Sequence, residues 1–255
     1  MLKVYAITHK EYQFAKERTV IGVGANRSIE GVSLYDNAGE NIADKNKSFC
    51  ELTALYWIWK NTNDEYVGFE HYRRFFAKEN FFSYREMTIK EMESILKKYD
   101  AILPIKNGIK GTTLYEQYAQ AHYQSDMDIC AEIIKEKYPE YYVDYKQALN
   151  VREGCRANVF VMSKKLMDEY CEWIFTILFE AEKRIDYSER DAYQQRVFGF
   201  LSERLFNVWL HHKKLKIKYL PIHDFNEGGK CLNLYRRGVR KLKRILTGNK
   251  EKNKK

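Results

Sequence analysis

Short apolar runs alternate along the chain with longer segments of helical periodicity. The short runs predict strands at Lys3–Thr8, Val32–Tyr35, Tyr66–Phe69, Ala101–Pro104, Asn158–Met162 and Lys216–Leu220. The periodic segments predict helices at Phe49–Lys60, Ile89–Tyr99, Leu114–Tyr123, Met127–Lys137 and Lys164–Lys183, with a further one within Gln194–His212. This alternation favours an α/β fold with a mainly parallel sheet flanked by helices.

The helix predicted at Phe49–Lys60 is apolar on almost every face, so we expect it inside a sizeable core. Ser48 and Glu51 at its start have the spacing of a capping box, in which both side chains satisfy backbone donors. A polar turn separates this helix from the strand at Tyr66–Phe69.

Charged residues follow that strand directly, and they include Glu70, His71, Arg73 and Arg74. Ligands of open α/β sheets bind beyond the carboxyl ends of the strands, where two arginines can neutralise a diphosphate through bidentate hydrogen bonds. Pairing of these arginines with nearby acids explains the same residues without a ligand.

Polar residues also follow the first two predicted strands. Thr8, His9 and Lys10 end the first one, where a nucleotide-binding sheet meets its base or ribose. Asp36, Asn37 and Asn41 follow the second, although such residues also form turns without any ligand.

Five motifs carry a resemblance to a known family: Ile7–Lys10, Asp36-Asn37 with Gly39 and Asn41, Cys50–Asn61, His71–Arg74 and Gly199–Leu205. Together they resemble bacterial glycosyltransferases that are encoded with capsule, exopolysaccharide and lipopolysaccharide synthesis genes and were long catalogued as a domain of unknown function. The resemblance implies a GT-A-like, Rossmann-like fold and transfer of a sugar from a nucleotide-sugar.

Many GT-A enzymes carry an Asp-x-Asp motif at this strand end, which binds a divalent metal. Here the segment from Glu70 to Arg74 stands in its place, so we expect the arginines to neutralise the phosphates and leave a requirement for Mn²⁺ or Mg²⁺ open. Asp126 and Asp128 do spell Asp-x-Asp, but side chains two apart on a helix face different directions.

Tyr118, His122 and Asp126 recur at intervals of four, which would place them on one face of a helix beside Gln117. We expect Gln117, His122 and Asp126 to bind the acceptor or the donor sugar. A hydrogen-bonded pair on the helix surface explains His122 and Asp126 equally well, and a metal there would lack a third ligand.

The C-terminal half resembles the acceptor half of inverting GT-A transferases over Ala157–Lys165, Gly199–Leu205 and Leu215–Pro221. The resemblance places Glu203 at the position of the catalytic base, with Arg204 in place of the usual acidic neighbour, and adds Asn158 as a sugar-binding candidate. Arg196, Gly199 and Glu203 are spaced at i, i+3 and i+7, one face if the segment is helical, which makes Arg196 a further candidate. Gly199 would leave room for a ligand on the same helix face. A structural ion pair of Glu203 with Arg196 or Arg204 is the alternative.

The net charge of +9 belongs to the C-terminal tail. Residues 236–255 hold ten Lys or Arg and one acid, which leaves 34 basic and 34 acidic residues elsewhere. We expect one domain over residues 1–233 and, over 234–255, a basic amphipathic helix with a disordered end. Tyr235, Val239, Leu242 and Leu246 would form its apolar face, suited to an anionic membrane surface unless the helix is simply solvated.

The five cysteines are widely spaced, and no Cys-x-x-Cys pair occurs, which argues against a disulfide framework or a zinc site. No signal peptide is recognisable, and the apolar stretch Trp173–Phe179 is far shorter than the roughly 20 residues that span a membrane. We therefore expect a cytoplasmic protein, peripheral at the inner face of the plasma membrane.

The resemblance implies transfer from a nucleoside-diphosphate sugar to a lipid-linked glycan in capsule, exopolysaccharide or lipopolysaccharide synthesis, and it favours inversion. A UDP-hexose is the favoured donor, and UDP-galactofuranose is an alternative. A non-enzymatic phosphate, nucleic-acid or membrane-binding module and a nucleotide-sugar hydrolase remain competing functions. A nucleic-acid partner is disfavoured because the chain outside the tail is formally neutral.

Overall fold

The computed structural model describes residues 1–224 except 13–14, 80–83, 109–110 and 156. Its strands are β1 Leu2–Thr8, β2 Thr19–Gly22, β3 Leu34–Tyr35, β4 Tyr66–His71, β5 Arg74–Glu79, β6 Tyr84–Glu86, β7 Ala101–Pro104, β8 Phe160–Ser163, β9 Ile217–Leu220 and β10 Ile222–Asp224. Its α-helices are α1 Asn46–Phe49, α2 Leu52–Asn61, α3 Ile89–Leu96, α4 Leu114–Ala121, α5 Gln124–Lys137, α6 Tyr142–Leu149, α7 Lys164–Arg184 and α8 Val197–Lys213.

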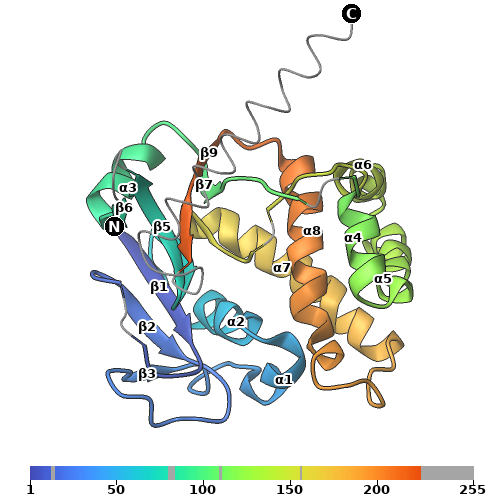
Figure 1. The fold of residues 1–255 in the computed structure, drawn as a ribbon, viewed down its shortest axis with the longest axis horizontal. Coiled ribbons are helices and arrows are strands. Elements are labelled where there is room, and N and C mark those ends of the chain that lie inside the picture. The colour runs from blue at the N-terminus through green and yellow to red at the C-terminus, as the bar shows by residue number, and fades with distance from the viewer. Residues whose placement is uncertain (13–14, 80–83, 109–110, 156, 225–255) are drawn as a thin grey trace, which may run out of the picture.

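One mixed sheet runs in the order β3-β2-β1-β4-β8-β7-β9 (Figure 1). β1 is parallel to β2 and β4, β3 is parallel to β2, and β9 is parallel to β7, whereas β8 runs antiparallel to both of its neighbours. β5 continues from β4 in a tight turn and pairs with β6 and β10. The expected α/β fold with a mostly parallel sheet and flanking helices is confirmed.

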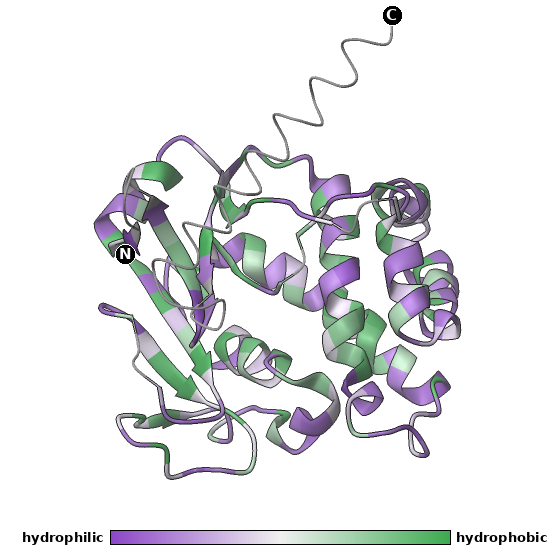
Figure 2. Cartoon of the chain, in the orientation of Figure 1, coloured by the Kyte–Doolittle hydropathy of each residue, from purple (hydrophilic) through white to green (hydrophobic). Residues whose placement is uncertain are grey.

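Both faces of the central strands are buried, and the two faces contact different cores. On β1, Leu2 and Val4 join a cluster beneath α3, whereas Tyr5 and Ile7 join the larger cluster formed with α2, α7 and α8. The side-chain period of two along a strand produces this division. Figure 2 shows the apolar residues gathered along β1 and on the part of α8 nearest α1.

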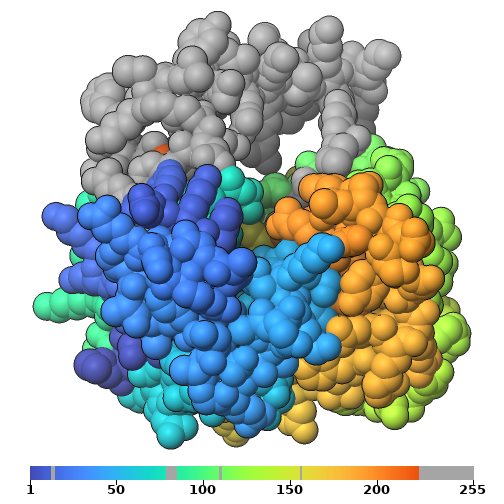
Figure 3. Space-filling model, turned by 90° about the horizontal axis from the view of Figure 1, so that it is seen from below, coloured from blue at the N-terminus to red at the C-terminus, as the bar shows by residue number. Residues whose placement is uncertain are grey.

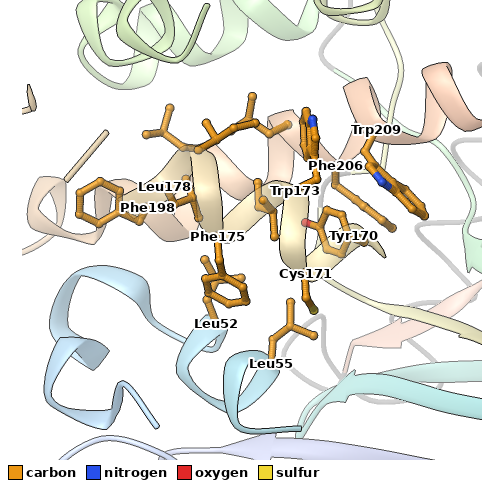
Figure 4. Packing of buried hydrophobic residues seen from close by; sticks show 14 of the residues in the cluster. Leu52, Leu55, Tyr170, Cys171, Trp173, Phe175, Leu178, Phe198, Phe206 and Trp209 are labelled. Atoms are coloured by element: carbon orange, nitrogen blue, oxygen red, sulfur yellow. The ribbon is translucent and has the colours of Figure 1, made fainter. Parts of the chain in front are cut away.

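The larger core packs α7 against α2 and α8 with aromatic side chains. Tyr170, Phe206 and Trp209 meet at one end (Figure 4). The Trp59 and Phe175 rings stack with centroids 5.8 Å apart. Burying a side chain of this size contributes roughly 1.5–3 kcal/mol. The helix expected at Phe49–Lys60 is therefore a core helix, as predicted.

The capping box expected at the start of that helix is wrong. Helix α1 ends at Phe49, Cys50 adopts φ 54° and ψ −130°, and α2 begins at Leu52. Ser48 lies within α1 and its hydroxyl donates to the carbonyl of Lys45. A positive φ at a residue other than glycine has no local sequence signal, which is why the apolar pattern read as one helix.

A second break separates α4 from α5. The chain is extended at His122, with φ −140° and ψ −171°, so Tyr118 and Asp126 lie on different helices. The expectation of one helix face carrying Tyr118, His122 and Asp126 is therefore wrong. Capping boxes do occur at Thr88 with Glu91 and at Thr113 with Glu116, where they begin α3 and α4.

The parallel strands β1, β2, β3 and β4 end at one edge of the sheet. Thr8 is aligned with Gly22, Gly22 with Tyr35, and Ile7 with His71. The amide of Tyr72 donates to the carbonyl of Ile7 across 2.9 Å and closes this edge. The residues after these strands therefore lie close together, as the position of ligand sites in α/β sheets requires.

Within the part of the chain that the structure describes, no helix is long and apolar enough to cross a membrane. Cys50, Cys130, Cys155 and Cys171 are free thiols. The predicted amphipathic tail with Tyr235, Val239, Leu242 and Leu246 lies outside the described residues.

Candidate active site

Two strand ends place positive charge around one buried tyrosine. Tyr72 lies between β4 and β5, with Lys10 Nζ 5.6 Å and Arg73 Cζ 5.8 Å from its ring centre. The His9 ring meets the same tyrosine edge-on at 5.4 Å. Residues that follow β1 and β4, more than 60 positions apart in the sequence, thus share one surface.

A third cation joins them from the start of α8. The pKa of His9 is lowered, first by partial burial and then by the charges of Lys10, Arg73 and Arg196. Arg196 therefore lies in the field of the same site. At neutral pH, His9 is an uncharged imidazole surrounded by three positive side chains.

None of these three cations forms an ion pair within the described residues. Lys10 contacts the Tyr72 ring, Arg196 donates from Nε to the Cys50 sulfur at 3.2 Å, and the buried Nε of Arg73 has no hydrogen-bond partner among those residues. Three neighbouring cations without ion-pair partners among the described residues repel one another and favour an anion between them. The alternative that Arg73 pairs with an acid is not what the structure shows.

The neighbouring charges of the His71–Arg74 turn have structural partners. Glu70 is buried and forms an ion pair with Arg18 at 2.7 Å, and one of its oxygens also accepts from the amide of Phe76. Arg74 begins β5 opposite His71. Glu70 therefore holds the β4–β5 turn in place.

A buried carboxylate marks the outer end of the same sheet edge. Asp36 follows β3 and accepts from Arg27 at 2.6 Å, while its Oδ2 has no hydrogen bond to any described residue. Asn37 is exposed. Asn41 bonds to the Gly39 carbonyl and the Ala43 amide, so its amide shapes the turn before α1.

The break at Cys50 brings Glu51 into contact with the C-terminal half. Asn158 Nδ2 donates to Glu51 Oε1 at 2.9 Å and lies 2.9 Å from Ser202 Oγ, whose hydroxyl donates to the Gly199 carbonyl at 2.8 Å. Asn158 is almost fully buried. The carboxylate expected to cap a helix is instead fixed beside α8.

Gly199 serves close packing, and the expectation that it leaves room for a ligand is wrong. A Cβ atom at this position would lie 3.1 Å from the Cys50 sulfur and 3.3 Å from its Cβ. The Cys50 thiol fills the space, and burial raises its pKa to about 11, with the Glu51 charge adding to the effect. The thiol is therefore protonated at neutral pH.

Glu203 lies one helical turn further along α8. Its carboxylate forms an ion pair with Arg204 at 3.2 Å; the Glu203 side chain is 23% exposed and that of Arg204 only 6%. Its charge also contributes to the raised pKa of Cys50, which places it near the same break. Of the two ion pairs considered, the structure contains the one with Arg204.

The other predicted sugar ligands have different surroundings. Asp126 is buried and bound by both terminal nitrogens of Arg190, at 2.7 and 2.8 Å. The Gln117 amide donates to the carbonyl of Thr112 at 3.2 Å and so holds the loop before α4. These contacts make Asp126 and Gln117 parts of the framework.

His122 lies nearer to the cations because its imidazole stacks on Phe200, with ring centres 4.1 Å apart. Its Nδ1 is 2.9 Å from Gln194 Oε1, just before Arg196. Burial lowers the pKa of His122 and the charge of Arg204 adds to this, whereas the Gln194 contact opposes it. The predicted hydrogen-bonded pair of His122 with Asp126 is replaced by this contact.

No group of three or more His, Cys, Asp or Glu side chains among the described residues is placed to hold a metal ion. Asp126 and Asp128 are separately engaged, since Asp128 accepts from the Tyr115 hydroxyl. Seen from the strand-end side, the surface is hollowed between the blue N-terminal segments and the orange start of α8 (Figure 3).

Sequence reasoning missed Glu51, Phe200 and Tyr193 as residues of the surroundings of Arg196. Glu51 was assigned to a cap because its spacing from Ser48 fitted one. Tyr193 and Phe200 lie within four positions of Arg196 in the sequence. A search for aromatic residues near the candidate cations would have found them.

Comparison with known proteins agrees with the fold and with a glycosyltransferase-like family. The profile of the family described as "Domain of unknown function (DUF4422)" matches residues 3–214. Among solved structures, the chain is similar to the apo structure of the bifunctional glycosyltransferase WbbM, with a TM-score of 0.77 and 29% identity. The match covers 88% of this chain and 45% of that one, so the chain spans about half its length. No curated protein sequence matches the chain.

Proposed function

We propose that this chain, which belongs to the family described as a domain of unknown function (DUF4422), transfers a sugar from a nucleoside-diphosphate sugar to a glycan acceptor. The similar structure is described as a bifunctional glycosyltransferase. That similarity supports the activity, and the surroundings of Lys10, Arg73 and Arg196 support the kind of donor.

The observation that carries the proposal is the set of three cations without acidic partners among the described residues. A nucleoside diphosphate brings two or more negative charges, and arginine binds phosphate oxygens through paired hydrogen bonds. Arg73 has a buried donor still to be satisfied. An anion between these side chains would satisfy it and relieve their mutual repulsion.

In the proposed reaction, the acceptor and the leaving group contact different residues. The acceptor hydroxyl oxygen forms a bond to the anomeric carbon, and the bond from that carbon to the diphosphate oxygen breaks. The hydroxyl proton passes to Glu203, the proposed base, and the electron pair leaves with the nucleoside diphosphate. Arg73 and Arg196 stabilise the charge that develops on the leaving group. Attack opposite the leaving group inverts the anomeric centre.

The nucleoside is assigned to the outer end of the sheet edge, near Thr8 and Asp36. The free Oδ2 of Asp36 can accept a hydrogen bond from a base or a ribose hydroxyl. The N3–H of uracil is one such donor, and the proposed donor substrate is a UDP-hexose or UDP-galactofuranose. Asn37 is exposed beside it.

The acceptor is proposed to be a lipid-linked glycan of capsule, exopolysaccharide or lipopolysaccharide synthesis. The basic composition of residues 236–255 supports attachment to an anionic membrane surface, at which such an acceptor is presented. His71 and Arg74, at the β4–β5 turn, complete the proposed donor site.

Thermal unfolding with a panel of nucleotide-sugars tests the donor assignment. The same panel with and without Mn²⁺ or Mg²⁺ reports on metal dependence. A ligand at 100 times its dissociation constant adds about 2.7 kcal/mol to the free energy of unfolding. We expect stabilisation by UDP-sugars and by UDP, and none by uridine. Absence of a shift with every nucleotide would contradict the proposal.

A further inference from the structure

The backbone at Cys50 is held in a conformation that favours glycine. Its φ of 54° and ψ of −130° interrupt two helices that would otherwise be continuous. Strained residues persist where the surrounding structure fixes them, and they cluster at functional sites. The consequence of this strain is the direction given to the next side chain, Glu51.

Glu51 uses one of its two carboxylate oxygens in a hydrogen bond to the described residues. Its Oε1 accepts from Asn158, whereas its Oε2 has no hydrogen bond to any residue that the structure describes. Asn158 is fixed from behind by Ser202, so the carboxylate is held without the use of its second oxygen. The side chain is partly exposed. A carboxylate fixed through one oxygen and open at the other is arranged to accept hydrogen bonds from a ligand.

A patch of aromatic rings lies on the other side of Arg196. The Phe200 ring is stacked on His122 at 4.1 Å and lies 5.0 Å from the ring of Tyr193. Tyr193 is 56% exposed, so its ring is accessible to a ligand. Gln194 fixes the patch to the end of α4 through the Ala121 carbonyl and His122.

Arg196 connects the two features. Its Cζ lies 5.4 Å from the centre of the Phe200 ring, while its Nε contacts the sulfur of Cys50, the residue before Glu51. The Glu51 carboxylate, the Arg196 guanidinium and the Phe200 ring are therefore neighbours. The Arg196 charge also links this surface to the proposed diphosphate site through His9.

This combination fits a sugar. One face of a pyranose ring presents C–H groups that pack on an aromatic ring, while its edge presents hydroxyls that donate to carboxylates and accept from guanidinium groups. A phosphate would be repelled by Glu51, and a purely apolar ligand would leave that carboxylate without its water partners. A neutral saccharide can pack on the aromatic rings and form hydrogen bonds with both Glu51 and Arg196.

We infer that the acceptor glycan binds across Arg196, with a sugar face on Tyr193 and Phe200 and a hydroxyl donating to the free oxygen of Glu51. This inference rests on the proposed function, because it identifies the acceptor side of the same site. It adds Glu51, Tyr193 and Phe200 as residues that contact substrate.

Saturation-transfer NMR with methyl β-D-galactopyranoside, methyl β-D-glucopyranoside and UDP in one sample tests the inference on the full chain. We expect transfer to the C–H protons of at least one glycoside with the wild type. Tyr193→Ala should weaken glycoside binding by about tenfold, and the matched variant Tyr193→Phe, which keeps the ring, should retain it. Tyr193 is exposed, so its truncation leaves the core intact.

Glu51→Gln tests the carboxylate separately. Glutamine can still accept from Asn158, so the fold is preserved, but the free oxygen becomes a donor. We expect glycoside binding to fall by about tenfold and UDP binding to stay within twofold. Recovery of glycoside binding in Glu51→Asp would support a role for the carboxylate charge, because a purely structural role would not depend on that charge.

The UDP signal separates failure of the inference from failure of the proposed function. A normal UDP signal with no glycoside signal, or with equal glycoside signals in wild type, Tyr193→Ala and Glu51→Gln, would overturn the acceptor site alone. Loss of the UDP signal in the wild type would overturn the donor site and the proposed function, whatever the glycosides do.

Discussion

Asn158 donates a hydrogen bond of 2.9 Å to Glu51 across 107 positions of sequence. This contact joins the segment before α2 to the segment before β8. Glu51 therefore does not complete a capping box, although its spacing from Ser48 suggests one. The two halves of the proposed site are thus fixed to each other by a partly buried hydrogen bond.

Arg73→Ala should weaken UDP binding by at least about tenfold, or about 1.4 kcal/mol, because the variant removes a guanidinium without an ion-pair partner among the described residues. Isothermal titration calorimetry measures the change. Arg85→Ala is the matched control, since Arg85 forms a surface ion pair with Glu91 at 2.6 Å. Equal UDP affinities for Arg73→Ala and wild type would remove Arg73 from the donor site.

Glu203→Gln should lower kcat by roughly 10² to 10⁴ while leaving the KM for the donor near its wild-type value. The reason is that glutamine cannot take the proton of the acceptor hydroxyl. Initial rates at saturating donor measure the effect, with circular dichroism as the control for folding. Near wild-type turnover would contradict the assignment of Glu203 as the base and leave it a structural role in the ion pair with Arg204.

Asp126→Ala should lower the free energy of unfolding by about 3 kcal/mol, because it leaves the Arg190 guanidinium buried without its partner. Urea denaturation measures this loss. Asp128→Ala is the matched control from the same Asp-x-Asp sequence, and its exposed position predicts a small change. Loss of UDP affinity in Asp126→Ala without loss of stability would restore Asp126 as a ligand-binding residue.

His9 should take up a proton when UDP binds near pH 6. In the free protein its pKa lies below the ordinary value because of burial and the neighbouring cations, and a bound diphosphate would reverse the effect of those cations. In the absence of ligand, the folded protein binds fewer protons here than the unfolded chain. The contribution of His9 to stability is therefore complete above the unfolded pKa of about 6.5 and falls as the pH decreases below it.

Calorimetric titration at pH 6 in two buffers with different ionisation enthalpies measures the proton uptake. His9→Asn is the control, because it removes this group while the phosphate of UDP still titrates. Identical proton uptake by His9→Asn and wild type would place the diphosphate away from His9.

The sequence predicted β1, β4 and β7 well because these strands are buried on both faces and read as continuous apolar runs. Of the second predicted strand, only Leu34–Tyr35 is regular, and β2 was missed because Thr19–Gly22 is short and partly exposed. Strands β5, β6 and β10 form through antiparallel turns that leave no strong local pattern. Helix α6 was missed because its tyrosines obscure the apolar period.

The strand-end rule found the cations of the site, since it depends only on which residues follow a strand. It gave no information on which cations are already neutralised. The ion pair between Arg190 and Asp126 joins positions 64 apart, and that between Arg18 and Glu70 joins positions 52 apart. Such pairings depend on tertiary packing, as does the break at Cys50 that directs Glu51.

Transfer from radiolabelled UDP-sugars to the lipid-extractable fraction of bacterial membranes tests the central claim most directly. We predict that the purified protein moves label from one UDP-sugar into that fraction, and that Arg73→Ala and Glu203→Gln do so at strongly reduced rates. Release of the label as free sugar at a rate unaffected by membranes would indicate a hydrolase, and no release of label from any UDP-sugar would contradict the proposed transfer altogether.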